Sequence, residues 1–170
     1  GGYDFEIVSL AGHTSGQCGV VERNAKLFFC ADQVILGLVP IVITSGKDQH
    51  LLTEYFASLR ELASDYSGYR FLPGHYGEFT EIKEETDRII AGYGERCTQL
   101  RQVLAESNRP MTLLELDQAL YIQRMQTYRY SFLFSYLHTW PKLFSCLDWL
   151  FETGVIDRTE KDGVLYWSLR

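Results

Sequence analysis

The feature that most constrains the fold of this chain is a change in the spacing of its apolar residues near Thr80. Before Thr80, short apolar runs surround one amphipathic segment, which is typical of strands mixed with helix. After Thr80, apolar residues recur every three or four positions, as they do along one face of a helix. The sequence therefore predicts two domains, an α/β domain over residues 1–80 and a mostly helical domain over residues 81–170.

The first domain is expected to contain three strands, a helix and a fourth strand. Apolar residues at helical spacing predict the helix over about 47–65. Gly37 and Pro40 interrupt the apolar run over 34–42, which favours a loop there. The predicted strands cover residues 5–10, 19–21, 26–30 and 69–72.

The second domain is predicted to begin with a long helix from Thr80 to about residue 107. Thr112 and Glu115 form a capping-box pattern, in which each side chain can accept a backbone N–H of the other, so a helix should start there. Asp162-Gly163 is a strong hairpin signal. Helices are expected over 113–121, 128–138 and 141–153, and strands over 155–158 and 164–169. Helices closed by a hairpin are the layout of a winged helix.

The charge distribution argues against a large nucleic-acid surface. The net charge is −6, and residues 1–80 contain five basic and nine acidic side chains, against eleven and thirteen in residues 81–170. Phosphate binding needs clustered Lys or Arg, but the predicted recognition helix at 143–152 is apolar and acidic. A structural or substrate-covering role of this domain is therefore favoured. The aromatic run over 128–140 leaves contact with nucleic acid open.

The cysteines and the hydropathy indicate a cytoplasmic protein. The four cysteines form no C-x-x-C pair, which predicts reduced thiols, three of them buried. No apolar run reaches the roughly 20 residues that span a bilayer. No signal peptide is recognised at the start of the sequence either, and we expect a cytoplasmic protein without a membrane segment.

Three short segments place a possible metal ligand directly after an expected strand. They are Gly12-His13-Thr14, Ala31-Asp32 and Pro73-Gly74-His75. In layered α/β proteins, functional side chains gather beyond the carboxyl ends of strands, because a rigid sheet holds the loops there. Imidazole and carboxylate groups bind zinc, iron or manganese. From these residues alone, a metal site and ordinary loop or core roles both stay open.

The order of strands and segments over about residues 5–80 resembles the C-terminal half of the metallo-β-lactamase superfamily. The resemblance implies one half of an αββα sandwich, in which two sheets lie between helices. It also implies two divalent metal ions, zinc or alternatively iron or manganese. His13 and His75 would each bind one ion, and Asp32 would bridge them and serve as the catalytic residue.

The same resemblance assigns neighbouring polar groups and shows departures from the family pattern. Thr14, Gln17 and Tyr76 are predicted to orient the imidazoles or to line the substrate site, and Glu78 is a further candidate. Tyr76 stands where the family commonly has Gly. The family's His-x-His-x-Asp-His segment, which supplies the other ligands, does not occur in these 170 residues. His50 and His138 are read as structural.

The implied activity is hydrolysis. In the intact family, two metal ions about 3.5–4 Å apart lower the pKa of a shared water towards about 7. The resulting hydroxide would attack a small-molecule ester, thioester or phosphoester. Because part of the ligand set is missing, this chain is expected to be a fragment of such an enzyme that is inactive alone and binds metal weakly or not at all.

Two other functions stay open, and a partner is expected in any case. The chain could be a non-catalytic structural or interaction module, or the nucleic-acid-binding part of a nuclease. The helical domain resembles the winged-helix-like extension of some family members. Half of a sandwich leaves one sheet face uncovered, so we expect it to pair with the missing N-terminal half or with a second copy in a dimer.

Overall fold

The computed structural model describes residues 2–43, 49–124 and 135–170. Its internal contacts divide the chain into two compact units. Unit 1 is built from the residues up to Ile43 and from Leu51 to Gly92, and unit 2 from Tyr93 to the C-terminus together with the residues just before Leu51. The division falls inside helix α2 (Ile82–Ser107), and the predicted boundary after residue 80 lies just before that helix.

The sheet of unit 1 explains why three strand ends meet at one edge. Its strands follow the order β1-β2-β3-β4, and they are β1 (Phe5–Ser9), β2 (Cys18–Glu22), β3 (Leu27–Ala31) and β4 (Arg70–Pro73). β2 is antiparallel to both β1 and β3, and β4 is parallel to β3. β1, β3 and β4 therefore run in the same direction and end at the same edge of the sheet. Each predicted strand of this sheet agrees with the observed strand to within about one residue at its ends.

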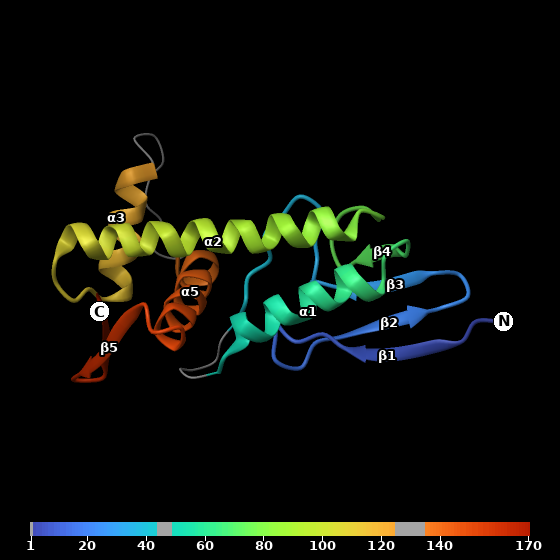
Figure 1. Ribbon diagram of the computed structural model, residues 1–170, viewed down its shortest axis with the longest axis horizontal. Coiled ribbons are helices and arrows are strands. Elements are labelled where there is room, and N and C mark those ends of the chain that lie inside the picture. Colours follow the sequence, from blue (N-terminus) through green and yellow to red (C-terminus); the bar gives the residue numbers. More distant parts are fainter. Residues whose placement is uncertain (1, 44–48, 125–134) are drawn as a thin grey trace. The chain divides into compact units, whose positions relative to one another are not determined.

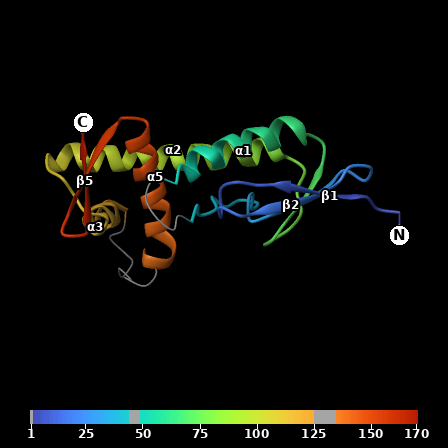
Figure 2. The same cartoon turned by 90° about the horizontal axis from the view of Figure 1, so that it is seen from below.

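Helix α1 (Leu51–Asp65) covers one face of this sheet (Figure 1, Figure 2). Val21, Phe28 and Phe71 are neighbours in register on that face and are fully buried. Burying each such side chain contributes about 1.5–3 kcal/mol, so this layer is the core of unit 1. The predicted apolar stripe of α1 is confirmed, because its buried residues are Leu51, Leu52, Tyr55, Phe56, Leu59 and Leu62.

The start of α1 differs from the prediction. The helix begins at Leu51 and not near residue 47, because His50 has a φ of 53°, which a right-handed helix cannot contain. Residues 47 and 48 of the predicted helix lie outside the described residues.

The other face of the sheet is apolar and open in the described part of unit 1. Ile7, Val20, Phe29 and Leu72 are neighbours in register across all four strands and so share this face. Ile7 is 75% exposed and Phe29 is 39% exposed. Phe5, two residues before Ile7, is 56% exposed on the same face. An apolar surface of this kind is characteristic of an interaction site.

Unit 2 combines helices with a hairpin. It contains the second part of α2, then α3 (Leu113–Arg124), the π-helix η1 (Ser135–Thr139), α5 (Trp140–Glu152), β5 (Ile156–Lys161) and β6 (Val164–Leu169). The capping box is confirmed, because the backbone N–H of Thr112 donates to Glu115 Oε2 at 2.8 Å and that of Glu115 to Thr112 Oγ1 at 3.3 Å. Most of the predicted helix over 128–138 lies outside the described residues, and its last part belongs to η1.

The hairpin of unit 2 has the turn that the sequence predicts. Asp162 and Gly163 have φ values of 53° and 76°, and a two-residue turn of type I′ requires positive values at both positions. The backbone of Met111 pairs with that of Trp167 on β6 through bonds of 2.8 and 2.9 Å. The winged-helix resemblance of this unit stays a prediction. Across the ranges that the structure describes, no helix has the length and apolar character to cross a membrane.

Candidate metal centre

The structure brings the three predicted ligands together at the edge where β1, β3 and β4 end. Nε2 of His13 lies 3.7 Å from Oδ2 of Asp32, and Nε2 of His75 lies 3.5 Å from the same oxygen. These separations are too long for strong hydrogen bonds. Two imidazole nitrogens therefore converge on one carboxylate oxygen without being bonded to it.

The imidazole of His13 is held in one orientation by the backbone. Its Nδ1 lies 2.6 Å from the carbonyl oxygen of Ile41, and its own carbonyl accepts the N–H of Ile43 at 2.9 Å. A carbonyl oxygen can only accept, so Nδ1 of His13 carries the hydrogen of this bond. In the neutral ring, Nε2 then keeps its lone pair on the side of Asp32, as a metal ligand must.

Asp32 is placed at the end of β3 by a tight backbone. Ala31, the residue before it, has a φ of 48°, which turns the chain out of the strand. The carbonyl of Ala31 accepts the N–H of Gly74 at 2.9 Å, which ties the ends of β3 and β4 together. Oδ1 of Asp32 is buried and has no hydrogen-bond partner among the described residues. One of its two carboxylate oxygens thus lacks the compensation that burial normally requires.

The predicted neighbours of the ligands are more dispersed. His75 itself is 65% exposed on the turn after β4, and the exposed Tyr76 beside it has a φ of 64°. Oε1 of Glu78 lies 3.5 Å from Nη1 of Arg70. The carbonyl oxygen of Thr14 lies 3.4 Å from the backbone nitrogen of Gln17 in the same loop. Tyr76 therefore belongs to the surface of the turn and not to the core of unit 1.

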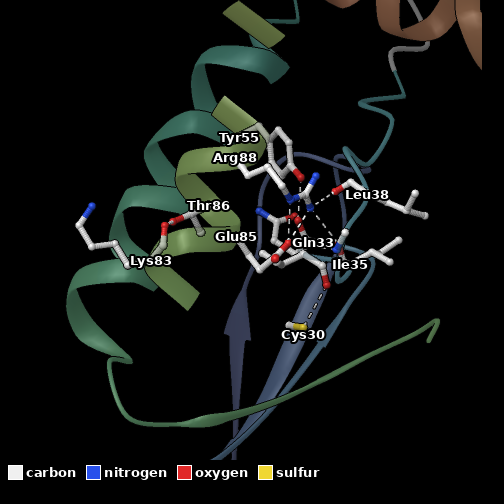
Figure 3. A network of polar contacts seen from close by, with 11 residues as sticks. Cys30, Gln33, Ile35, Leu38, Tyr55, Lys83, Glu85, Thr86 and Arg88 are labelled. Carbon is white, nitrogen blue, oxygen red and sulfur yellow. Dashed lines mark hydrogen bonds and ion pairs between the residues drawn. The ribbon is translucent and has the colours of Figure 1, made fainter. Parts of the chain in front are cut away.

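Gln33 is the residue of this region that the sequence did not single out. The side-chain amide of Gln17 donates to Oε1 of Gln33 at 2.9 Å. Gln17, which was predicted to lie beside the ligands, is therefore bonded to Gln33. Figure 3 shows Gln33 beneath Tyr55 of α1, close to the segment around Ile35 and Leu38. Only its position next to Asp32 in the sequence could have pointed to Gln33, because a glutamine in a loop usually indicates no particular function.

Arg88 of α2 fastens the segment that follows Gln33 (Figure 3). Its Nη2 donates to the carbonyl of Leu38 at 2.6 Å and to Oε2 of Glu85 at 2.6 Å. Oε2 of Glu85 also accepts the N–H of Gly37 at 3.2 Å. The loop predicted over 34–42 is therefore anchored to a helix of the same unit by charged groups.

Two buried cysteines, Cys30 and Cys146, have thiols whose pKa is raised above the ordinary value. Cys30 is buried, and burial raises the pKa of its thiol to about 12, so it is protonated at neutral pH. Burial, reinforced by the nearby Cys97, also raises the pKa of Cys146. The prediction of free thiols, three of them buried, is confirmed, with Cys18 as the exposed one.

The convergent residues supply donor atoms but not a finished coordination site. Two ligands of one ion lie at most about 4.4 Å apart, twice a typical bond length, so separations of 3.5 and 3.7 Å are compatible with a shared ion. Yet in the part of the chain that the structure describes, no group of three His, Cys, Asp or Glu side chains is arranged to hold a metal ion. A cavity of 540 Å³ between β1 and α1 is lined by other residues.

Comparison with solved structures identifies the class of fold. A metallo-beta-lactamase family protein from Thermus thermophilus matches 99% of this chain with a TM-score of 0.79 and 19% sequence identity. A beta-lactamase domain protein from Burkholderia ambifaria matches 100% of it, with a TM-score of 0.79 and 18% identity. The chain spans 50% and 49% of the length of these two proteins.

The chain therefore has the mixed α+β fold of about half of a metallo-β-lactamase family protein. This confirms the predicted fold class. No family model and no curated protein matches the sequence.

Proposed function

We propose that this chain is part of a metal-dependent hydrolase in which His13, Asp32 and His75 bind metal. The observation that carries the proposal is the approach of Nε2 of His13 and of His75 to Oδ2 of Asp32, at 3.7 and 3.5 Å. The buried Oδ1 of Asp32 supports it, because leaving a buried polar atom without a partner costs about 1–3 kcal/mol, which a cation would offset.

The donor set fits a divalent ion such as zinc, with iron or manganese as alternatives. A bound ion supplies Lewis acidity and a water that ionises near neutral pH, the chemistry needed to hydrolyse an ester, thioester or phosphoester. His13 presents a fixed Nε2 because Nδ1 is bonded to Ile41. Asp32 contributes the negative charge that offsets the ion, and His75 presents its Nε2 from the exposed turn after β4.

Two ions are proposed for the complete centre, although this chain contains only part of the ligand set. Three donors that do not surround an ion give weak binding, because most of the affinity of a metal site comes from a complete and oriented shell. Weak binding by the chain alone, and no hydrolysis by it, are therefore expected.

The open face of the sheet is proposed to receive the rest of the fold. The chain spans about half of each matched structure, and the face that carries Ile7, Val20, Phe29 and Leu72 is apolar and uncovered in the described part of unit 1. A second sheet packed about 10 Å away would bury this surface. Light scattering tests the alternative occupant, since a stable dimer of this chain would indicate that a second copy takes this place.

A non-catalytic interaction module is the second candidate function. It is favoured by the lack of an assembled three-ligand group within the described residues and by the exposure of His75. In that case the apolar face would be the functional surface, and loss of Asp32 would leave the function intact.

Hydrolysis by the full-length protein separates the two candidates. A panel of small ester, thioester and phosphoester substrates would be assayed with added Zn²⁺ for the wild type and Asp32→Ala. Asp65→Ala, which changes an exposed aspartate at the end of α1, is the control. We expect Asp32→Ala to abolish hydrolysis and Asp65→Ala to leave it unchanged. Full activity of Asp32→Ala would rule out the proposed centre.

A further inference from the structure

We infer that Gln33 is a positioning residue that fixes the His13 loop against Asp32, an inference that rests on the proposed metal centre. Gln33 directly follows Asp32 and is fully buried, although it is polar. A buried amide is stable only when its donors and acceptor have partners. The partners of Gln33 therefore show what the residue holds in place.

The side chain of Gln33 forms hydrogen bonds with three other residues of unit 1. Its Nε2 donates to the carbonyl of Ala11 at 2.7 Å and to Oγ of Ser58 at 2.8 Å. Its Oε1 accepts the side-chain N–H of Gln17 at 2.9 Å. The orientation of the amide is determined, because the carbonyl of Ala11 can only accept and must face the nitrogen.

Two of these partners are the two ends of the loop that carries His13. Ala11 begins the loop and Gln17 ends it, and its base is closed by the bond from the N–H of Leu10 to the carbonyl of Gln17 at 2.9 Å. One buried side chain thus spans the loop from end to end. Since Gln33 is adjacent to Asp32 in the chain, it links the position of His13 to that of the carboxylate.

Tyr55 of α1 contacts both Gln33 and the loop that carries His13. Its hydroxyl donates to the carbonyl of Gln33 at 2.7 Å, as Figure 3 shows. Its ring lies against Gly12, where a Cβ atom would be only 2.1 Å from Tyr55 Cδ2. The backbone of Gln33 and the residue before His13 are therefore both fixed by one tyrosine. Polar networks of this kind rigidify what they connect.

The consequence for the centre is geometric. The bond from His13 Nδ1 to Ile41, which selects the tautomer, forms only while the loop keeps its place. Residues that orient metal-binding histidines typically change metal affinity about 10- to 100-fold when they are replaced. Loss of the Gln33 bonds should therefore alter the His13 tautomer and the metal affinity, whereas a role in stability alone would alter neither in the folded protein.

The experiment is NMR spectroscopy of the chain with ¹⁵N-labelled histidine, at a pH above about 7.5 where an ordinary imidazole is neutral. The wild type is expected to show His13 as one tautomer with the hydrogen on Nδ1. Gln33→Leu removes all three side-chain bonds at similar side-chain size, and should give a mixture of tautomers. In a Zn²⁺ titration followed at His13, Gln33→Leu should bind Zn²⁺ at least about 10-fold more weakly than the wild type.

The matched control is Gln102→Leu, the same substitution at an exposed position of α2 whose amide bonds Glu106 at 2.9 Å. It should leave the His13 signals and the affinity unchanged. If Gln33→Leu does not fold, Gln17→Leu takes its place, because it removes only the bond to Oε1, and the same changes are expected on a smaller scale.

The outcomes separate this inference from the proposed function. If the folded Gln33→Leu variant, or Gln17→Leu in its place, keeps the wild-type tautomer and Zn²⁺ affinity, Gln33 is not a positioning residue, while the metal centre stands. If Zn²⁺ moves the signals of neither His13 nor His75 in the wild type, the metal centre itself is wrong, and the inference falls with it.

Discussion

Gly74 approaches Asp32 so closely that a Cβ atom at position 74 would lie 2.5 Å from Oδ1 of the carboxylate. Its N–H also donates to the carbonyl of Ala31 at 2.9 Å. The end of β4 can therefore meet the end of β3 at this distance only because residue 74 has no side chain. This contact also sets where His75, the next residue, begins.

Replacing Gly74 should displace the carboxylate of Asp32. We predict that Gly74→Ala destabilises the protein by about 1–3 kcal/mol, the usual cost of overpacking, and weakens Zn²⁺ binding. Gly77→Ala in the same turn is the control, because nothing lies within 4 Å of a Cβ atom there, and it should stay within about 0.5 kcal/mol. Urea denaturation followed by circular dichroism measures the stability of the two variants. Equal midpoints would contradict the close approach.

Gly12 offers a second test of the backbone next to a ligand. Its φ is 144°, and a Cβ atom would lie 2.1 Å from the ring of Tyr55. Strain and overpacking together should make Gly12→Ala less stable by at least about 2 kcal/mol. Gly16→Ala, in the same loop but with open space around it, should be nearly neutral. Thermal denaturation of the two variants decides, and a Gly12→Ala protein as stable as Gly16→Ala would refute the packing described here.

The strands and α1 could be predicted because their signals are local. Leu51, Tyr55, Leu59 and Leu62 recur at helical spacing, and each strand is a short apolar run ended by polar or glycine residues. The start of α1 could not be predicted, because it depends on the left-handed backbone of His50. Tertiary context, which a local pattern does not contain, decided that boundary.

The ligands of the candidate centre were visible from sequence, but the residue that positions them was not. His13, Asp32 and His75 each follow a strand, and the directions of β1, β3 and β4 bring those ends to one edge. Gln33 owes its role to Ala11 and Ser58, which are 22 and 25 positions away in the chain. Contacts over such separations leave no periodic signal.

The capping box of α3 predicts a pH dependence of stability. The pKa of Glu115 is lowered from its ordinary value of 4.5, mainly by the backbone N–H of Thr112 and then by Arg109. A lowered pKa in the folded state means that the stabilisation is present above the ordinary value and is lost as the pH falls through the folded pKa. Glu115→Gln keeps a capping side chain but does not titrate.

Between pH about 5 and about 3, the wild type should therefore lose more stability than Glu115→Gln. The measurement is the free energy of unfolding from urea titrations at several pH values in this range. Identical pH profiles for the two proteins would show that the capping carboxylate does not contribute.

A buried ion pair in unit 2 predicts a strongly destabilising substitution. Nη1 of Arg158 donates to Oδ1 of Asp148 at 2.8 Å, and the side chains are only 10% and 6% exposed. Arg158→Met leaves the carboxylate of Asp148 buried without this partner, which typically costs about 3–5 kcal/mol. The double variant Asp148→Leu, Arg158→Met should recover much of this loss, because no buried charge is left behind.

The control for the buried pair is an exposed ion pair that involves the β5–β6 hairpin. Nε of Arg170 lies 3.1 Å from Oδ1 of Asp157, with side chains 59% and 48% exposed. Arg170→Met should therefore cost no more than about 1 kcal/mol. Guanidinium chloride denaturation of the variants provides the comparison, and a loss for Arg158→Met as small as that for Arg170→Met would argue against burial of the pair.

The most direct test of the proposed centre uses the four histidines of the chain as probes in one sample. Zn²⁺ would be titrated into ¹⁵N-histidine-labelled wild type and Asp32→Asn while the ring nitrogens are followed by NMR. We predict weak, saturable shifts at His13 and His75, none at His50 and His138, and at least about 10-fold weaker binding in Asp32→Asn. Shifts confined to His50 and His138, or unchanged binding in Asp32→Asn, would contradict a metal centre built on His13, Asp32 and His75.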